Sequence, residues 1–290
     1  VGEAAAAILA DALASKHAGL VATAAEMLHA HPERALVLAA SEKRAALDPH
    51  APPPTPNPAQ EIAPAVAKAL AAALAEKWPE DRFETRIALV EAAASLRHPQ
   101  AKAAATELCN DANPVLRERA QKALRTLGAP VTACDAPDRE VRGAAEVGHT
   151  LARPVKVVLT TDAGELTIVL EPELSPVTAT RIAALARSGF YKGIVVHRVV
   201  PGFVAQFGDP DGDGYGGAGT SLRCETSPVP FGPLDVGMAL AGRDTGSSQL
   251  FVTLSRTPHL DGEYTRVGRA EGDWASVAQG DVITDVRVIE

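Results

Sequence analysis

The sequence predicts two domains, an all-α half followed by a mainly-β half. Residues 1–150 hold 43 alanines and 5 glycines, whereas residues 151–290 hold 13 alanines and 18 glycines. Because Ala is the best helix former and Gly among the worst, this shift indicates helices first, then strands with turns. A length of 290 residues also fits two domains. The boundaries that we expect are 1–130 for the helical region, 131–153 for a linker and 154–290 for the second domain.

Composition narrows the classes of function. With 46% hydrophobic and 22% charged residues the chain can build a packed core. The net charge of -8, without any basic block, argues against nucleic-acid binding. Asp11 and Lys68 interrupt the most apolar stretches, so we expect no membrane span.

Cysteine and histidine usage predicts neither a metal nor a cofactor. Cys109, Cys134 and Cys224 are too few and too far apart for a disulfide framework or a paired-cysteine metal site. We expect buried or inert thiols. A disulfide between Cys109 and Cys134 stays open as a possibility, so the cysteines do not decide between a reducing and an oxidising compartment. The eight histidines are scattered without an HExxH pair, so a zinc site is not expected.

Two motif matches in the second half lack their required context. Gly214–Gly219 fits GxGxxG, but no helix is predicted after it, as a dinucleotide site requires. Asp209, Asp211 and Asp213 resemble the start of a calcium loop, but position twelve is Thr220 instead of Glu. We therefore interpret this segment as a polar turn.

Apolar residues at helical spacing predict a series of short helices in the first half. Six prolines in Asp48–Pro58 predict a stiff extended break. The last helix is the best defined, since Asn113 can cap it, Pro114 suits its first turn and Gly128 its end. The predicted helices are Glu3–Ser15, Leu20–His29, Pro32–Leu47, Gln60–Glu76, Pro79–Leu96, Pro99–Cys109 and Pro114–Leu127.

The segment Asn113–Gly128 resembles the HEAT/armadillo type of α-solenoid, in which paired helices stack against their neighbours. The concave face of such solenoids commonly holds another protein, so the resemblance implies a protein partner for the helical region. A plain Ala-rich helical bundle that serves as a spacer stays open as the alternative.

The second half changes to strand periodicity. Asp162-Ala163-Gly164 divides two β-rich runs and predicts a hairpin. Many short strands with turn signals and one or two helices indicate a closed antiparallel barrel. The predicted strands are Val155–Thr160, Glu165–Leu170, Ile194–Val200, Val204–Phe207, Leu250–Leu254 and Val282–Ile289, with a helix at Val177–Ser188.

Three motifs in this half occur in a specific order. They are HRVVPGFVAQFGD at 197–209, GSSQLF at 246–251 and TPHLDG at 257–262, with GMALAG at 237–242 between the first two. In order and spacing they resemble the cyclophilin family of peptidyl-prolyl isomerases, from about Val155 to Glu290. The resemblance implies a closed barrel of about eight strands with two helices, an isomerase that needs no metal or cofactor, and proline-containing polypeptide clients.

Arg198 is the residue that we expect to carry the chemistry. Rotation about an Xaa-Pro bond needs only a lower barrier, because both isomers lie within about 0.5–1 kcal/mol of each other. Twisting localises the lone pair on the prolyl nitrogen, and a permanently charged guanidinium can hydrogen-bond that nitrogen better in the twisted state. The resemblance implies Arg198, Phe203 and Gln206 as catalytic residues. It also implies a set of substrate-binding residues, which are Val204, Gly214, Ala239, Leu240, Ala241, Gln249, Phe251, His259, Leu260 and Tyr264.

Some positions depart from the family pattern. His259 stands where eukaryotic members often carry Trp, Leu240 where Asn is usual, and Val204 where Met is usual. Tyr264 is a substitution typical of bacterial members, which together with the alanine content suggests a bacterial chain of the cytoplasm, periplasm or cell envelope. The residues alone give no account of Phe207, which stands in place of a Gly. A non-catalytic proline-peptide-binding or scaffold protein stays open as the alternative function.

Overall fold

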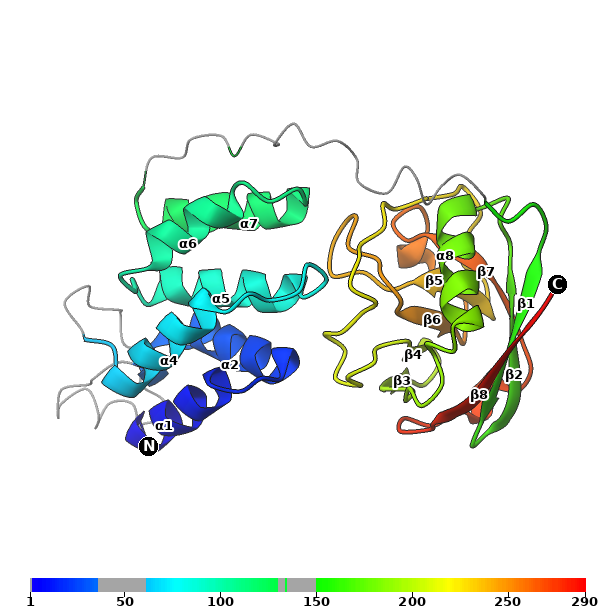
Figure 1. Cartoon of the computed structure of the whole chain (residues 1–290), viewed down its shortest axis with the longest axis horizontal. Coiled ribbons are helices and arrows are strands. Elements are labelled where there is room, and N and C mark those ends of the chain that lie inside the picture. Colours follow the sequence, from blue (N-terminus) through cyan, green and yellow to red (C-terminus); the bar gives the residue numbers. More distant parts are fainter. Residues whose placement is uncertain (1, 36–60, 130–133, 135–149) are drawn as a thin grey trace. The chain divides into compact units, whose positions relative to one another are not determined.

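Two units with different secondary structure make up the chain, residues 1–138 (the helical unit) and residues 139–290 (the sheet unit) (Figure 1). The computed structural model describes residues 2–35, 61–129, 134 and 150–290. Among these residues, none of the helices combines the length and the apolar character that a membrane crossing requires.

The helical unit follows the predicted order of helices. Of the predicted helix Pro32–Leu47 only a 3-10 turn, η1, at Pro32–Ala35 lies within the described residues; the rest of it and the proline-rich break at 48–58 lie outside them. The helix predicted from Pro79 begins later, because a turn in which Arg82 N–H donates to Pro79 O precedes it. The observed α-helices are α1 (Gly2–Leu13), α2 (Ala18–Ala30), α4 (Pro64–Ala75), α5 (Phe83–Ser95), α6 (Ala101–Leu108) and α7 (Pro114–Thr126).

Helix α5 is the centre of the helical unit, and it packs on α2 and on α7 (Figure 1). Its Leu89 and Ala92 join the core shared with α1, α2 and α4, whereas Ile87 and Val90 join the core shared with α6 and α7. The buried hydroxyl of Thr85 donates to Ala18 O at 3.1 Å. The helix is buried on nearly every side, and its residues 87–90 and 92–94 are accordingly all apolar.

The end of the helical unit is defined by a cap and a cross-link. The side chain of Asn113 accepts a hydrogen bond from Val115 N–H at 2.9 Å, as predicted, and Gly128 ends α7 with φ +66°. Cys109 and Cys134 form a disulfide, with Cα atoms 4.8 Å apart. The expectation of inert thiols is therefore wrong for this pair, because the chain returns past the end of α6 after α7. Cys224 is a free cysteine.

The sheet unit contains one eight-stranded antiparallel sheet in the order β3-β4-β6-β5-β7-β2-β1-β8. The predicted hairpin is present, with Thr161 paired with Gly164 across its turn. Short strands β5 and β7 were not predicted. The strands are β1 (Val155–Thr161), β2 (Gly164–Leu170), β3 (Arg198–Val200), β4 (Val204–Phe207), β5 (Asp235–Met238), β6 (Leu250–Thr253), β7 (Arg266–Glu271) and β8 (Ile283–Ile289).

The closed barrel that the sequence predicts is wrong, because the sheet is curled but open between β3 and β8. The predicted strand Ile194–Val200 is reduced to the three residues of β3, and an isolated bridge between Val195 and Val282 joins the segments before β3 and β8. The two helices of the prediction are also wrong for residues 150–290, where the structure has one α-helix. It is α8 (Pro176–Arg187), accompanied by the 3-10 turns η3 (Pro258–Leu260) and η4 (Trp274–Ser276).

Phe207 is explained by the core of the sheet unit. It is buried, stacks on Trp274 with ring centres 6.0 Å apart, and meets the edge of Tyr191 at 6.1 Å. Trp274 Nε1–H donates to Glu271 O, and in the helical unit Trp78 Nε1–H donates to Ala73 O. A glycine at 207 would leave the face of Trp274 without this partner.

Candidate functional site

Four neighbouring strands bring Arg198, Gln206, Phe251 and Gly237 into one row. Arg198 on β3 pairs with Gln206 on β4, Gln206 pairs with Phe251 on β6, and Phe251 pairs with Gly237 on β5. Directly paired residues of antiparallel strands project from the same face of a sheet. The guanidinium, the amide and the phenyl ring therefore share one face.

Arg198 is exposed, yet its guanidinium has two defined neighbours. Nη1–H donates to Gln206 Oε1 at 3.3 Å, and Cζ lies 5.8 Å from the centre of the Phe203 ring. The turn between β3 and β4 sets this geometry, since Gly202 adopts φ +70° and Phe203 N–H donates to Val200 O. A guanidinium has five N–H donors, so further donors remain for a ligand.

Two glutamines connect Arg198 to a neighbouring loop. Gln249 Nε2 donates to Gly214 O and to Gly216 O, both at 2.8 Å, and Gln206 Nε2 donates to Gln249 Oε1 at 2.8 Å. Because two main-chain carbonyls can only accept, they orient the Gln249 amide, which in turn orients that of Gln206. The Gln206 oxygen is consequently presented to Arg198.

A buried carboxylate organises the loop that Gln249 contacts. Asp209 is fully buried and accepts hydrogen bonds from the N–H groups of Asp211, Asp213 and Gly214 at 2.6–3.0 Å. This arrangement supports the interpretation of a polar turn, since the Asp209 oxygens accept hydrogen bonds from the main chain.

A largely buried apolar cluster lies beside Arg198 and Gln206. Phe251 is its central member, with ring centres 5.6 Å from Phe231 and 5.6 Å from Tyr264. His259 is exposed and packs its ring on Phe203 at 5.2 Å. We name this group the aromatic cluster; its members are Phe203, Val204, Phe231, Ala239, Phe251, Leu260 and Tyr264.

Gly237 makes room for the Phe251 ring. A Cβ atom added at Gly237 would lie 2.2 Å from Phe251 Cζ, which is closer than real Cβ contacts. No residue larger than glycine fits here unless the ring moves. The position of Phe251 therefore depends on the bare backbone of β5.

His197 is not placed to carry a proton. Neither imidazole nitrogen has a hydrogen-bond partner among the described residues. Burial lowers the pKa of His197, an effect that Arg198 strengthens and that Asp209 and Asp213 oppose. The imidazole is consequently neutral near pH 7.

The structure brings most of the predicted site residues together, but not all of them. Ala239 joins the aromatic cluster, and its N–H donates to Gln249 O at 2.9 Å. Leu240 instead packs against the main core of the sheet unit. The N–H of Ala241 donates to Thr245 Oγ1 at 2.8 Å, within the turn that follows β5.

Two residues of the site were missed by sequence reasoning, Phe231 and Gly237. Phe231 lies in a loop between prolines, where no periodicity marks a buried side chain. A large aromatic residue in such a segment is the signal that could have identified it. The role of Gly237 is visible only in the structure, where the Phe251 ring occupies the space that a side chain at 237 would need.

Comparisons with known proteins match the sheet unit to one family. The family model described as "Cyclophilin type peptidyl-prolyl cis-trans isomerase/CLD" matches residues 156–279. Peptidyl-prolyl cis-trans isomerase B of Bacillus subtilis is 42% identical over 134 residues, which are 44% of this chain and 92% of the relative.

Two further relatives are named peptidyl-prolyl cis-trans isomerase. The one from Synechococcus elongatus is 37% identical over 139 residues, 46% of this chain and 96% of the relative. The one from Helicobacter pylori strain 26695 is 40% identical over 143 residues, 47% of this chain and 88% of the relative. With a relative of this identity covered almost end to end, the chain belongs to the cyclophilin-type peptidyl-prolyl cis-trans isomerase family.

Proposed function

We propose that the sheet unit accelerates rotation about Xaa-Pro bonds of polypeptide clients, with Arg198 as its catalytic residue. The observation that carries this proposal is the guanidinium held between Gln206 Oε1 and the Phe203 ring, beside the aromatic cluster. A planar peptide bond resists rotation by about 18–20 kcal/mol, because the nitrogen lone pair is delocalised into the carbonyl. Donation from Arg198 to the prolyl nitrogen strengthens as the bond twists, and this lowers the barrier.

We assign the prolyl ring to the aromatic cluster. Phe203, Phe251 and Leu260 supply apolar contact, and His259 extends the surface at Phe203. Gln206 is near enough to Arg198 to bind the substrate backbone beside it. We assign the residues before the proline to the surface formed by Gly214, Ala239, Leu240, Ala241 and Gln249, with Val204 and Tyr264 as further walls of the prolyl site.

Replacement of Arg198 tests the catalytic role. We expect Arg198→Ala to lower kcat/KM for a Xaa-Pro tetrapeptide by about 10²- to 10³-fold, the usual loss when a transition-state donor is removed. Arg198→Lys should restore little, because an ammonium does not reproduce the planar fork of a guanidinium. The assay is protease-coupled isomerisation, and Arg287→Ala, on an exposed residue of β8 paired with Glu165, is the matched control. A near-normal rate of isomerisation with Arg198→Ala would overturn the assignment.

The pH dependence of activity tests whether a proton is moved. Arginine keeps its charge throughout the accessible range, and the lowered pKa of His197 moves its protonation below the ordinary value of about 6.5. We therefore expect kcat/KM to be flat from about pH 6 to about pH 9. The profile is repeated in His259→Gln, because His259 packs on Phe203. A limb near pH 7 that persists in this variant would contradict catalysis without proton transfer.

A variant at Gly237 tests the role of Phe251. Because the added Cβ of Gly237→Ala would overlap the ring, we expect Phe251 to move and kcat/KM to fall by about tenfold or more. The control is Ile168→Ala on β2, which opens a cavity in the main core of the sheet unit. Both variants should lose stability in thermal unfolding, but equal losses of activity would count against a specific role for the Phe251 ring.

We also propose that the helical unit binds protein clients, as a stack of helix pairs of the HEAT/armadillo type. The support is the central position of α5 between two cores and the exposure of large apolar residues on α1 and α2. Ile8→Lys with Leu20→Lys, in the full chain, should leave isomerisation of a tetrapeptide unchanged. The same variant should slow catalysed refolding of a denatured protein limited by prolyl isomerisation. Equal acceleration by variant and wild type would exclude a role for these two residues.

A further inference from the structure

Phe231 is buried although the loop around it is exposed. Its side chain is 1% exposed, whereas Pro230 and Pro233 are exposed. The ring packs on Phe251 in the aromatic cluster. One wall of the proposed prolyl site is thus carried by a loop and not by a strand.

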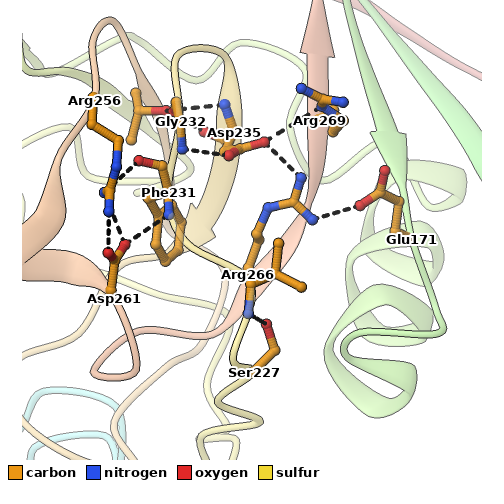
Figure 2. Close-up of polar contacts among 11 residues, drawn as sticks. Glu171, Ser227, Phe231, Gly232, Asp235, Arg256, Asp261, Arg266 and Arg269 are labelled. Carbon is orange, nitrogen blue, oxygen red and sulfur yellow. Dashed lines mark hydrogen bonds and ion pairs between the residues drawn. The ribbon is translucent and has the colours of Figure 1, made fainter.

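The main chain of Phe231 is held on both sides by one ion pair (Figure 2). Its N–H donates to Asp261 Oδ1 at 2.7 Å, and its carbonyl accepts from Arg256 Nη1 at 2.8 Å. Arg256 and Asp261 also bond to each other, through Nη1 to Oδ1 at 3.0 Å and through Nη2 to Oδ2. We name this arrangement the Phe231 clamp.

The clamp joins two walls of the aromatic cluster. Arg256 and Asp261 flank the turn η3, whose Leu260 belongs to the cluster and whose His259 packs on Phe203. Phe231 belongs to the same cluster and packs on Phe251. The ion pair therefore ties the loop at 231 to the turn at 258–260, together with the hydrogen bond that Thr257 N–H donates to Phe231 O at 3.3 Å.

A second network holds the residue that follows Phe231 (Figure 2). Gly232 N–H donates to Asp235 Oδ2 at 2.7 Å, and Gly232 O accepts from Thr253 Oγ1 at 2.6 Å. The buried Arg266 donates to Asp235 Oδ1 at 2.6 Å and to Glu171 at 2.8 Å. Because Gly232 is already fixed, the clamp needs only to set the direction from which the Phe231 ring enters the cluster.

The geometry points to Arg256 and Asp261 as positioning residues of the isomerase site, which act on the prolyl ring through Phe231 and rest on the function proposed above. Both side chains are partly exposed, so the ion pair by itself adds little to global stability. Its effect is geometric, because it fixes the main chain of Phe231, whose ring packs on Phe251. In support, the hydrogen bonds from Arg256 and from Phe231 N–H lower the pKa of Asp261, so the carboxylate stays ionised near neutral pH.

Loosening the clamp should weaken ground-state and transition-state contact with the prolyl ring alike. We expect Arg256→Gln and Asp261→Ala to raise KM for a Xaa-Pro tetrapeptide about three- to tenfold, with kcat within about twofold of wild type. Asp261→Asn keeps an oxygen acceptor for Phe231 N–H and should raise KM less than Asp261→Ala. A residue that served stability alone would not produce this order of effects on KM at temperatures well below unfolding.

A double-mutant cycle tests whether the effect passes through Phe231. With Phe231→Leu the ring is gone, so adding Arg256→Gln should raise KM no further. Arg287→Gln, which breaks an exposed ion pair on β8, is the control and should leave KM unchanged. Thermal unfolding of each variant is measured in parallel, and Asp261→Asn provides a folded comparison if Phe231→Leu is unstable.

The outcomes separate this proposal from the proposed function. An unchanged KM in Arg256→Gln and Asp261→Ala, in a chain whose activity depends on Arg198, overturns the clamp and leaves the function standing. Additive effects of Arg256→Gln and Phe231→Leu on KM also overturn it. A wild-type chain that neither isomerises the tetrapeptide nor binds it in an NMR titration overturns both.

Discussion

The site depends on the orientation of one amide, that of Gln249. Gly214 O and Gly216 O can only accept hydrogen bonds, so Gln249 must turn its nitrogen to them and its oxygen to Gln206. Were the loop at 214–216 to move, both glutamines could reverse, and Arg198 would face an N–H group instead of an oxygen. The acceptor beside Arg198 is therefore set by backbone atoms two side chains away.

Strand order explains why Arg198, at the polar end of this row, is accessible. β3 is an edge strand, so Arg198 has a paired strand on one side only. The next strands, β4 and β6, have nearly all of their residues buried and give the row a rigid base. The open sheet thus places the charged group at an edge and the Phe251 ring farther inside.

Much of the fold could be predicted because the signals were local. β4 was predicted residue for residue, and Asn113 and Gly128 end α7 as their chemistry requires. β7 was missed because Arg266 interrupts the apolar pattern, and its charge is buried only because Asp235 and Glu171 meet it from other strands and loops. The open sheet was likewise not predictable, because closure depends on whether the edge strands β3 and β8 pair with each other, and these strands are far apart in sequence.

The site followed the same division. Arg198, Phe203 and Gln206 belong to one continuous motif, so sequence could group them, and in the structure Arg198 contacts both of the others. Phe231 and Gly237 act through Phe251, which is distant in sequence from both, and only the folded chain shows these contacts. The isomerase activity follows from family membership, whereas the role of the helical unit rests on our proposal.

The two indole side chains described above have a practical consequence. The chain has 2 tryptophans, and each unit contains one of them, Trp78 in the helical unit and Trp274 in the sheet unit. Trp274 is fully buried against Phe207, whereas Trp78 is only partly buried. Intrinsic fluorescence is thus divided between two emitters in different surroundings, one in each unit.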